Sequence, residues 1–222
     1  MLCKAPWNHI QINAEGTVNP CCMFSPTIYH EKYKNLQDAF NGQENQNLRK
    51  KMLNGELIDG CQKCDLYESL NKFSYREHFD LKYDSSTLQN PKIRELEFAL
   101  DNVCNFKCVT CNSRFSSKWY NDDLKLIDLN IPRYSEAIHK RKKVIRNVNN
   151  LEGLDLSELN YLKLIGGEPF INDSYIDILK NLKLENLELA LITNNSVFPD
   201  KWIEFILKVK TLNLHISIDG VY

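Results

Sequence analysis

The chain contains eight cysteines, and they fall into two groups separated by a long stretch that has none. The first group is spread over the N-terminal third and comprises Cys3, Cys21, Cys22, Cys61 and Cys64. The second is compact and comprises Cys104, Cys108 and Cys111. In a reducing compartment, cysteines at short spacings bind metals or iron-sulfur clusters more often than they form disulfides. The pattern therefore predicts two separate sites.

The compact group has the spacing C-x3-C-x2-C, which is one thiolate short of a closed site. A [4Fe-4S] cube that is bound by three protein thiolates keeps one iron open for an external ligand. A structural zinc site would need a fourth ligand from elsewhere in the chain, and this alternative stays open. Of these two alternatives, only the open cluster would make this loop a site of chemistry.

The elements around this loop alternate between strands and helices from Ile93 onward. The expected strands are Ile93–Leu100, Tyr161–Ile165, Leu187–Thr193 and Leu212–Ile218. The expected helices are Ser113–Leu129, Ser135–Val148, Ser174–Leu182 and Pro199–Val209. Alternation of this kind predicts an α/β fold with parallel strands and functional residues at their carboxyl ends.

Small and polar residues follow each of these strands. The cysteine loop follows the first strand, and Gly166-Gly167-Glu168-Pro169 follows the second. Thr193-Asn194-Asn195 ends the third strand, and Ser217-Ile218-Asp219-Gly220 ends the fourth. Each motif alone is also a common turn sequence. Their placement after successive strands is what points to a shared site.

The last expected strand has one apolar face and one polar face. Leu212, Leu214, Ile216 and Ile218 alternate with Asn213, His215, Ser217 and Asp219. In a barrel, the polar face would line a lumen that holds a polar cofactor, and the apolar face would pack on outer helices. The alternative is an edge strand with a solvated face. His215, and Glu97 on the first strand, are candidate lumen residues or ordinary hydrogen-bonded ones.

Together these motifs resemble the radical S-adenosylmethionine superfamily. The resemblance implies that Cys104, Cys108 and Cys111 bind a [4Fe-4S] cluster whose open iron binds S-adenosylmethionine. It also implies cofactor contacts from the motifs at the strand ends, namely Gly166, Gly167, Glu168, Thr193, Asn194, Ser217 and Asp219. In the family, reductive cleavage of the cofactor gives a 5'-deoxyadenosyl radical that abstracts hydrogen. One position departs from the pattern, because Thr110 stands where the family often has an aromatic residue.

The N-terminal segment resembles the twitch or SPASM type of auxiliary-cluster domain. The resemblance rests on Cys3-Lys-Ala-Pro-Trp7, Gly16-Thr-Val-Asn-Pro-Cys21-Cys22, Cys61-Gln-Lys-Cys64 and the later Ser116-Ser-Lys-Trp119. It implies that Cys3, Cys21, Cys61 and Cys64 bind a second iron-sulfur cluster and that Cys22 does not. A structural zinc site with four cysteine ligands is the alternative.

These resemblances predict two domains. Residues 1–84 would form the small cysteine-rich domain, and residues 85–222 would form the N-terminal part of a (β/α)6 barrel, with a polar linker at Asp84–Pro91. Barrels of the family usually have six strand-helix units, so this would be a partial barrel. The chain would be a fragment, or a half-barrel completed by a partner. We therefore expect weak or no turnover from it.

The composition limits the classes of partner. The formal net charge is -1, so no overall field favours nucleic acid or an anionic membrane. The basic run His139–Lys143, with Arg146, is interpreted as a solvated helix face. We find no signal peptide or membrane span, and we expect a cytoplasmic protein with neither membrane nor nucleic acid as partner.

The leading hypothesis is therefore a radical S-adenosylmethionine enzyme. Its expected partners are S-adenosylmethionine, a reductant such as flavodoxin or ferredoxin, and a substrate that is first expected to be a peptide or protein, with sugars and nucleotides open. The rival hypothesis is a non-catalytic, cysteine-rich module that binds zinc or iron-sulfur clusters and serves interaction. Metal content distinguishes the two.

Overall fold

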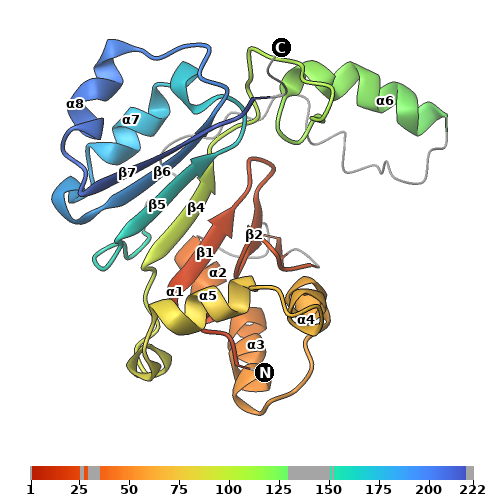
Figure 1. Ribbon diagram of the computed structural model, residues 1–222, viewed down its shortest axis with the longest axis vertical. Coiled ribbons are helices and arrows are strands. Elements are labelled where there is room, and N and C mark those ends of the chain that lie inside the picture. The colour runs from red at the N-terminus through yellow and green to blue at the C-terminus, as the bar shows by residue number, and fades with distance from the viewer. Residues whose placement is uncertain (1, 26–27, 30–35, 130–150, 152, 219–222) are drawn as a thin grey trace. The chain divides into compact units, whose positions relative to one another are not determined.

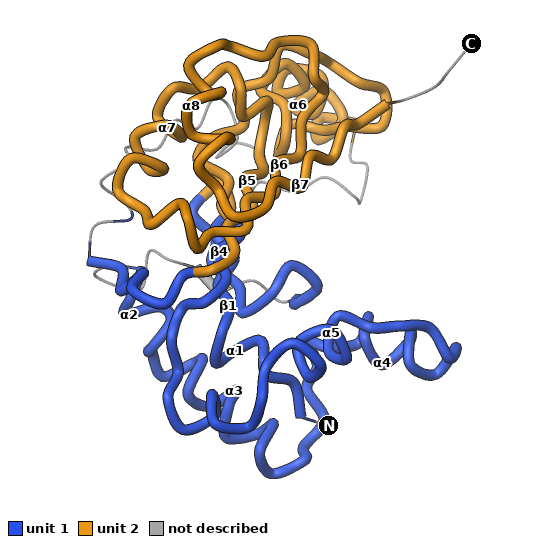
Figure 2. Tube along the Cα trace, turned by 60° about the vertical axis from the view of Figure 1, so that its left-hand side comes forward, with its two compact units in different colours: residues 1–12, 16–97, 151–159 blue, residues 13–15, 98–150, 160–222 orange. Residues whose placement is uncertain are grey.

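The computed structural model describes residues 2–25, 28–29, 36–129, 151 and 153–218 (Figure 1). The helix expected at Ser135–Val148, the basic run His139–Lys143 and Asp219 lie outside these residues. By contacts the chain divides into two compact units (Figure 2). Unit 1 comprises residues 1–12, 16–97 and 151–159, and unit 2 comprises 13–15, 98–150 and 160–222. These units are defined by contacts alone, so the predicted domains 1–84 and 85–222 stay predictions.

Seven strands form a mixed sheet in the order β3-β2-β1-β4-β5-β6-β7. They are β1 (His9–Ile12), β2 (Thr17–Asn19), β3 (Ile28–Tyr29), β4 (Glu95–Ala99), β5 (Tyr161–Ile165), β6 (Glu188–Thr193) and β7 (Thr211–Ile216). The first three pair antiparallel and the last three pair parallel. The α/β class is confirmed, whereas the described strands form no closed barrel. All four expected strands are present, but the sequence did not predict β1–β3.

Unit 1 carries the N-terminal helices. They are α1 (Ala5–Asn8), α2 (Leu36–Asn41), α3 (Gln43–Leu53), α4 (Gln62–Ser69) and α5 (Tyr75–Lys82). The sequence also indicates helices near Leu36–Phe40 and Leu48–Leu53, and these correspond to α2 and α3. The polar run expected as a linker forms a 3-10 turn at Ser85–Leu88, where Asn8 Nδ2 donates to Thr87 Oγ1 at 3.2 Å. With 11 residues, α3 is the longest described helix, and none of the helices described here could cross a bilayer.

A buried arginine holds the short helix α1 in place. Arg49 donates from Nε and Nη2 to the carbonyl oxygen of Pro6, at 2.9 and 2.7 Å, and from Nη2 to that of Phe40 at 3.1 Å. Its guanidinium also lies over the rings of Trp7 and Phe40. Burial lowers the pKa of Arg49 to about 10, which leaves it charged at neutral pH. The segment that follows Cys3 is therefore fixed by contacts to its backbone.

Unit 2 is built on the parallel strands and the helices that follow them. Leucines alternate along β5 and β6, and Leu162, Leu164, Leu189 and Leu191 are fully buried. Helices α7 (Ser174–Leu179) and α8 (Ile203–Ile206) lie on one side of these strands (Figure 1). Among the described residues of this unit, a third α-helix is α6 (Tyr120–Asp128), which follows the cysteine loop.

The terminal strand β7 corrects one expectation. Its apolar residues were predicted to pack on outer helices, but Leu212, Leu214 and Ile216 are 36, 38 and 45% exposed, and Ile218 beyond the strand is 68% exposed. The reason is the position of β7, because it is the last of the described strands in the sheet and pairs among them with β6 alone. The edge-strand alternative therefore describes the structure better.

The buried hydroxyl of Tyr175 joins the ends of two strands in unit 2. It accepts a hydrogen bond from Leu100 N at 2.8 Å and donates to the carbonyl oxygen of Ile165 at 2.7 Å. Leu100 and Ile165 immediately precede the cysteine loop and the Gly-Gly-Glu-Pro segment, respectively. Burial raises the pKa of Tyr175 above its ordinary value, so the hydroxyl keeps its proton.

We predict that Tyr175→Phe lowers the free energy of unfolding by about 1–3 kcal/mol, because two buried backbone groups lose their partner. Urea denaturation measures this change. Tyr67→Phe serves as the control, since Tyr67 is 42% exposed and its substitution should cost much less. Equal costs for the two variants would contradict the assigned role of Tyr175.

Candidate functional site

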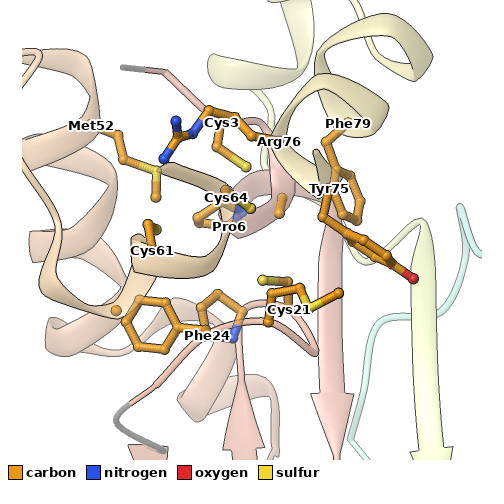
Figure 3. A pocket seen from close by; sticks show the side chains of 14 residues that line it. Cys3, Pro6, Cys21, Phe24, Met52, Cys61, Cys64, Tyr75, Arg76 and Phe79 are labelled. Atoms are coloured by element: carbon orange, nitrogen blue, oxygen red, sulfur yellow. The ribbon is translucent and has the colours of Figure 1, made fainter. Parts of the chain in front are cut away.

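Four cysteines of unit 1 line a single cavity (Figure 3). They are Cys3, Cys21, Cys61 and Cys64. The cavity holds about 370 Å³ of empty space, part of it open to solvent. The remaining walls are mainly apolar, with Pro6, Phe24, Met52, Tyr75 and Phe79 among the lining residues. The structure thus brings together the four cysteines that the resemblance assigned to one cluster, and Cys22 is not among the described lining residues.

The four cysteines come from three separate parts of the chain, because Cys61 and Cys64 share one helical stretch. Cys3 precedes α1, Cys21 follows β2, Cys61 ends the 3-10 turn Asp59–Cys61, and Cys64 lies in the first turn of α4. Two glycines help to bring the segments together. Gly16 has a φ of 88° in the turn between β1 and β2. A Cβ on Gly60 would lie 2.3 Å from the ring of Phe24, so the backbone before Cys61 packs closely on that ring.

The cavity disfavours ionised thiols. Burial raises the pKa of Cys3 to about 12 and holds that of Cys21 well above its ordinary value. Burial also raises the pKa of Cys61, although Arg76 opposes the shift. Neighbouring thiols add to each shift because two thiolates would repel one another. A cation that binds here therefore has to displace protons, and it supplies the charge that the thiolates need.

The donor set of the cavity fits an iron-sulfur cluster. The eight cysteines, all within the described residues, form no disulfide. In the part of the chain that is described, no three His, Cys, Asp or Glu side chains meet closely enough to share one metal ion. A [4Fe-4S] cube binds each thiolate through a different iron, so its ligands need not converge on one point. Four thiols around an apolar cavity are the donor set that such a group requires.

Residues 3–65 match the SPASM family, an iron-sulfur cluster-binding domain. The match includes all four cysteines of the cavity, and domains of this family are typical of radical S-adenosylmethionine enzymes. It supports iron-sulfur binding by the N-terminal segment. No curated protein and no solved structure matches the chain. The match ends before β4, so it covers none of the residues of the second cysteine group.

The second cysteine group lies in a loop of unit 2, between β4 and α6. Cys104, Cys108 and Cys111 are all half-buried. The loop is held from the helix side, where the Trp119 indole donates to the carbonyl oxygen of Cys108 at 2.9 Å and Ser116 Oγ donates to that of Phe106 at 2.8 Å. The motif residues Ser116–Trp119 therefore shape the loop itself.

The glycines of the Gly166-Gly167-Glu168-Pro169 segment hold the start of the cysteine loop. Gly167 N donates to the carbonyl oxygen of Asp101 at 3.2 Å, and Glu168 N donates to that of Val103 at 2.9 Å. A Cβ on Gly167 would lie 1.9 Å from the Val103 oxygen, and one on Gly166, which has a φ of 125°, would lie 2.4 Å from the Asp101 oxygen. Both glycines are thus required by contact with the residues that precede Cys104.

Glu168 joins the ends of β5 and β6. It is 1% exposed, and its Oε1 accepts from Thr193 Oγ1 at 2.6 Å and from Phe170 N at 3.2 Å. Its Oε2 accepts from Asn194 N at 2.7 Å. A carboxylate offers about four acceptor positions, which leaves one for a further donor. The expected contact of Glu168 with the cofactor stays a prediction, and the structure adds a positioning role.

Asn194 connects the third strand end to the cysteine loop. Its Nδ2 lies 3.7 Å from Cys104 Sγ and donates to Asn105 Oδ1 at 3.0 Å. Ser217 lies at the next strand end, where its backbone N donates to the Thr193 carbonyl oxygen at 2.8 Å. Unit 2 thus brings Gly167, Glu168 and Asn194 into contact with the cysteine loop, while Ser217 lies at the end of the neighbouring strand.

Asp101 and Asn102, which were not identified from the sequence, hold the cysteine loop through hydrogen bonds of their side chains. Asp101 is 2% exposed, its Oδ1 accepts from Val103 N at 2.8 Å, and its Oδ2 accepts from Asn172 Nδ2. Asn102 donates from Nδ2 to the carbonyl oxygen of Ser113 at 2.9 Å. An Asp-Asn pair directly after a strand is a turn signal that could have found them.

The two remaining lumen candidates are placed differently. Glu97 is 5% exposed in unit 1, and its Oε1 accepts from Gln11 Nε2 at 3.1 Å. His215 is exposed on β7 in unit 2. Glu97 thus takes part in a buried polar network, which corresponds to the ordinary hydrogen-bonded residue that the sequence analysis gave as one alternative.

We predict that Gly167→Ala lowers the free energy of unfolding by about 2–3 kcal/mol, because the added methyl group overlaps the backbone of Val103. Gly55→Ala is the control, since Gly55 has a φ of 71° with open space around it and should cost about 1 kcal/mol from backbone strain alone. Thermal or urea unfolding compares the variants. A Gly167→Ala protein as stable as Gly55→Ala would refute the close contact.

We also predict that zinc, used as a probe of the unit 1 cavity, binds more weakly as the pH falls. The Cys3 thiol, with a pKa of about 12, holds its proton at neutral pH and has to release it on binding. The apparent affinity should fall about tenfold per pH unit for each proton displaced. Calorimetric titration at pH 6.5 to 7.5, in a chain with Cys104, Cys108 and Cys111 replaced by Ala, measures this slope.

Cys3→Ser should reduce that slope, because one proton fewer is displaced. Cys22→Ser is the matched control and should leave the slope unchanged. An identical slope in both variants would show that Cys3 does not bind the probe.

Proposed function

We propose that this chain contains the cluster-binding part of a radical S-adenosylmethionine enzyme. In this proposal, Cys104, Cys108 and Cys111 bind an open [4Fe-4S] cluster and Cys3, Cys21, Cys61 and Cys64 bind an auxiliary one. The match of residues 3–65 to the SPASM family carries the proposal, because domains of that family are typical of such enzymes.

The arrangement of unit 2 supports the assignment of the open cluster. Three half-buried thiols share one short loop. The side-chain amide nitrogen of Asn194 lies 3.7 Å from the sulfur of Cys104 in that loop. Three thiolates leave one iron for an external ligand. The backbone bonds from Gly167 and Glu168 to residues 101 and 103 would hold the loop rigid while that ligand binds.

The roles of the chain's own residues follow from these contacts. Asn194 would orient Cys104, and the remaining acceptor position of Glu168 would receive a hydrogen bond from the methionine amine. When bound, the cluster and S-adenosylmethionine would supply the carbon-centred radical that abstracts hydrogen from the substrate. A cluster bound by the four cysteines of the cavity would have no open iron. It would therefore transfer electrons, anchor substrate or stabilise unit 1.

We further propose a peptide or protein as the substrate class and a low-potential protein such as flavodoxin or ferredoxin as the reductant. The substrate class rests on the resemblance of the N-terminal segment to auxiliary-cluster proteins, and the reductant rests on the electron that cleavage of S-adenosylmethionine requires. Sugars and nucleotides are the competing substrate classes.

Anaerobic reconstitution with iron and sulfide tests the proposal. We expect about eight irons per chain, since two [4Fe-4S] clusters would be present. Adding S-adenosylmethionine should change the electron paramagnetic resonance spectrum of the reduced protein, because the cofactor binds directly to one iron. This readout needs no turnover.

Cys104→Ala should abolish the spectral change and lower the iron content to about four per chain, while Cys22→Ser should leave both as in the parent. A chain that takes up zinc in place of iron, with no response to S-adenosylmethionine, would support the rival module and refute the enzyme.

A further inference from the structure

Arg76 reaches the four-cysteine cavity from beyond the matched segment 3–65. It lies in the first turn of α5, is 6% exposed and lines the cavity together with Cys61 (Figure 3). Its side chain is hydrogen-bonded to that of Cys61. Among the described residues that line the cavity, it is the only one with a permanent charge.

The guanidinium is held in a fixed orientation by α4. Its Nη2 donates to Asp65 Oδ1 at 2.6 Å, and its Nη1 donates to Glu68 Oε2 at 2.6 Å. Ser74 Oγ donates to the other oxygen of Glu68 at 2.7 Å. Burial by itself lowers the pKa of Arg76, but Asp65 and Glu68 outweigh it and raise the pKa above its ordinary value. The group beside Cys61 is therefore a cation whose side chain has little freedom to move away.

We propose that Arg76 is a positioning residue that raises the reduction potential of the cluster in this cavity. The inference rests on the proposed function, because it requires an iron-sulfur cluster bound by Cys61. It assigns to Arg76 a role that the four ligands alone do not provide.

The physical reason is the charge of the reduced cluster. Reduction by an external low-potential donor adds one electron and therefore one negative charge to the cluster and its thiolates. A nearby cation, and an N–H group that donates to a ligand sulfur, stabilise the more negative form. Removing both should make the potential more negative.

Removing an acidic partner of Arg76 should change the reduction potential in the opposite direction. Asp65 and Glu68 neutralise part of the charge of Arg76, and Asp65 is the partner of the nitrogen Nη2. Asp65→Asn removes one negative charge and leaves the guanidinium less compensated. The potential should then become more positive, in the direction opposite to the change in Arg76→Gln.

The experiment uses the full chain with Cys104, Cys108 and Cys111 replaced by Ala, so that one cluster remains. After anaerobic reconstitution, the midpoint potential is measured by titration with dithionite, followed by electron paramagnetic resonance. Arg94→Gln is the matched control, because Arg94 also pairs with a carboxylate, that of Glu158 at 2.6 Å, but is not among the residues that line the cavity.

We expect a shift to more negative potential in Arg76→Gln, a shift to more positive potential in Asp65→Asn, and no shift in Arg94→Gln. If Arg76→Gln fails to bind a cluster, Arg76→Lys decides, because it loses the planar N–H donor beside Cys61 and should still make the potential more negative. Iron-loaded variants that all keep the parent potential would overturn the role of Arg76 and leave the proposed function standing. A parent chain that binds only zinc would overturn both.

Discussion

Unit 1 encloses four thiols in a largely apolar cavity, where negative charge is unfavourable without a cation. Burial raises the pKa of Cys3 and Cys21, and each thiolate would raise that of its neighbours. An empty cavity therefore holds neutral thiols, and a bound metal group replaces their protons. This constraint links the packing of the unit to its chemistry, because Cys3, Cys61 and the residues around them belong to the same hydrophobic core.

Unit 2 uses the backbone rather than burial to prepare its cysteine loop. Gly167 and Glu168 donate to carbonyl oxygens just before Cys104, and the Tyr175 hydroxyl joins the strand ends beneath them. Side chains complete the arrangement, since Glu168 accepts from Thr193 and Asn194. A loop that is fixed in this way loses little conformational entropy when a ligand binds.

Local patterns in the sequence predicted the strands of unit 2 well but not the bounds of all its helices, since α6 begins at Tyr120 rather than Ser113 and α8 covers only Ile203–Ile206. The strand Tyr161–Ile165 agrees at both ends, and the start of α7 at Ser174 agrees as well. The short strands β1–β3 were missed, because two to four residues are too few for an alternation to stand out. The packing of β7 was predicted wrongly, since exposure at a sheet edge depends on which other segments lie beside it.

The sequence by itself determined the two cysteine groups, the strand-end motifs and the match to an iron-sulfur domain, because residue types and spacings carry these features. Only the tertiary structure decided that Cys3, Cys21, Cys61 and Cys64 line one cavity, that Arg76 reaches it, and that Gly166 and Gly167 pack against the cysteine loop. These contacts join residues that are distant in the chain. Such contacts arise from packing, which spacing alone does not reveal.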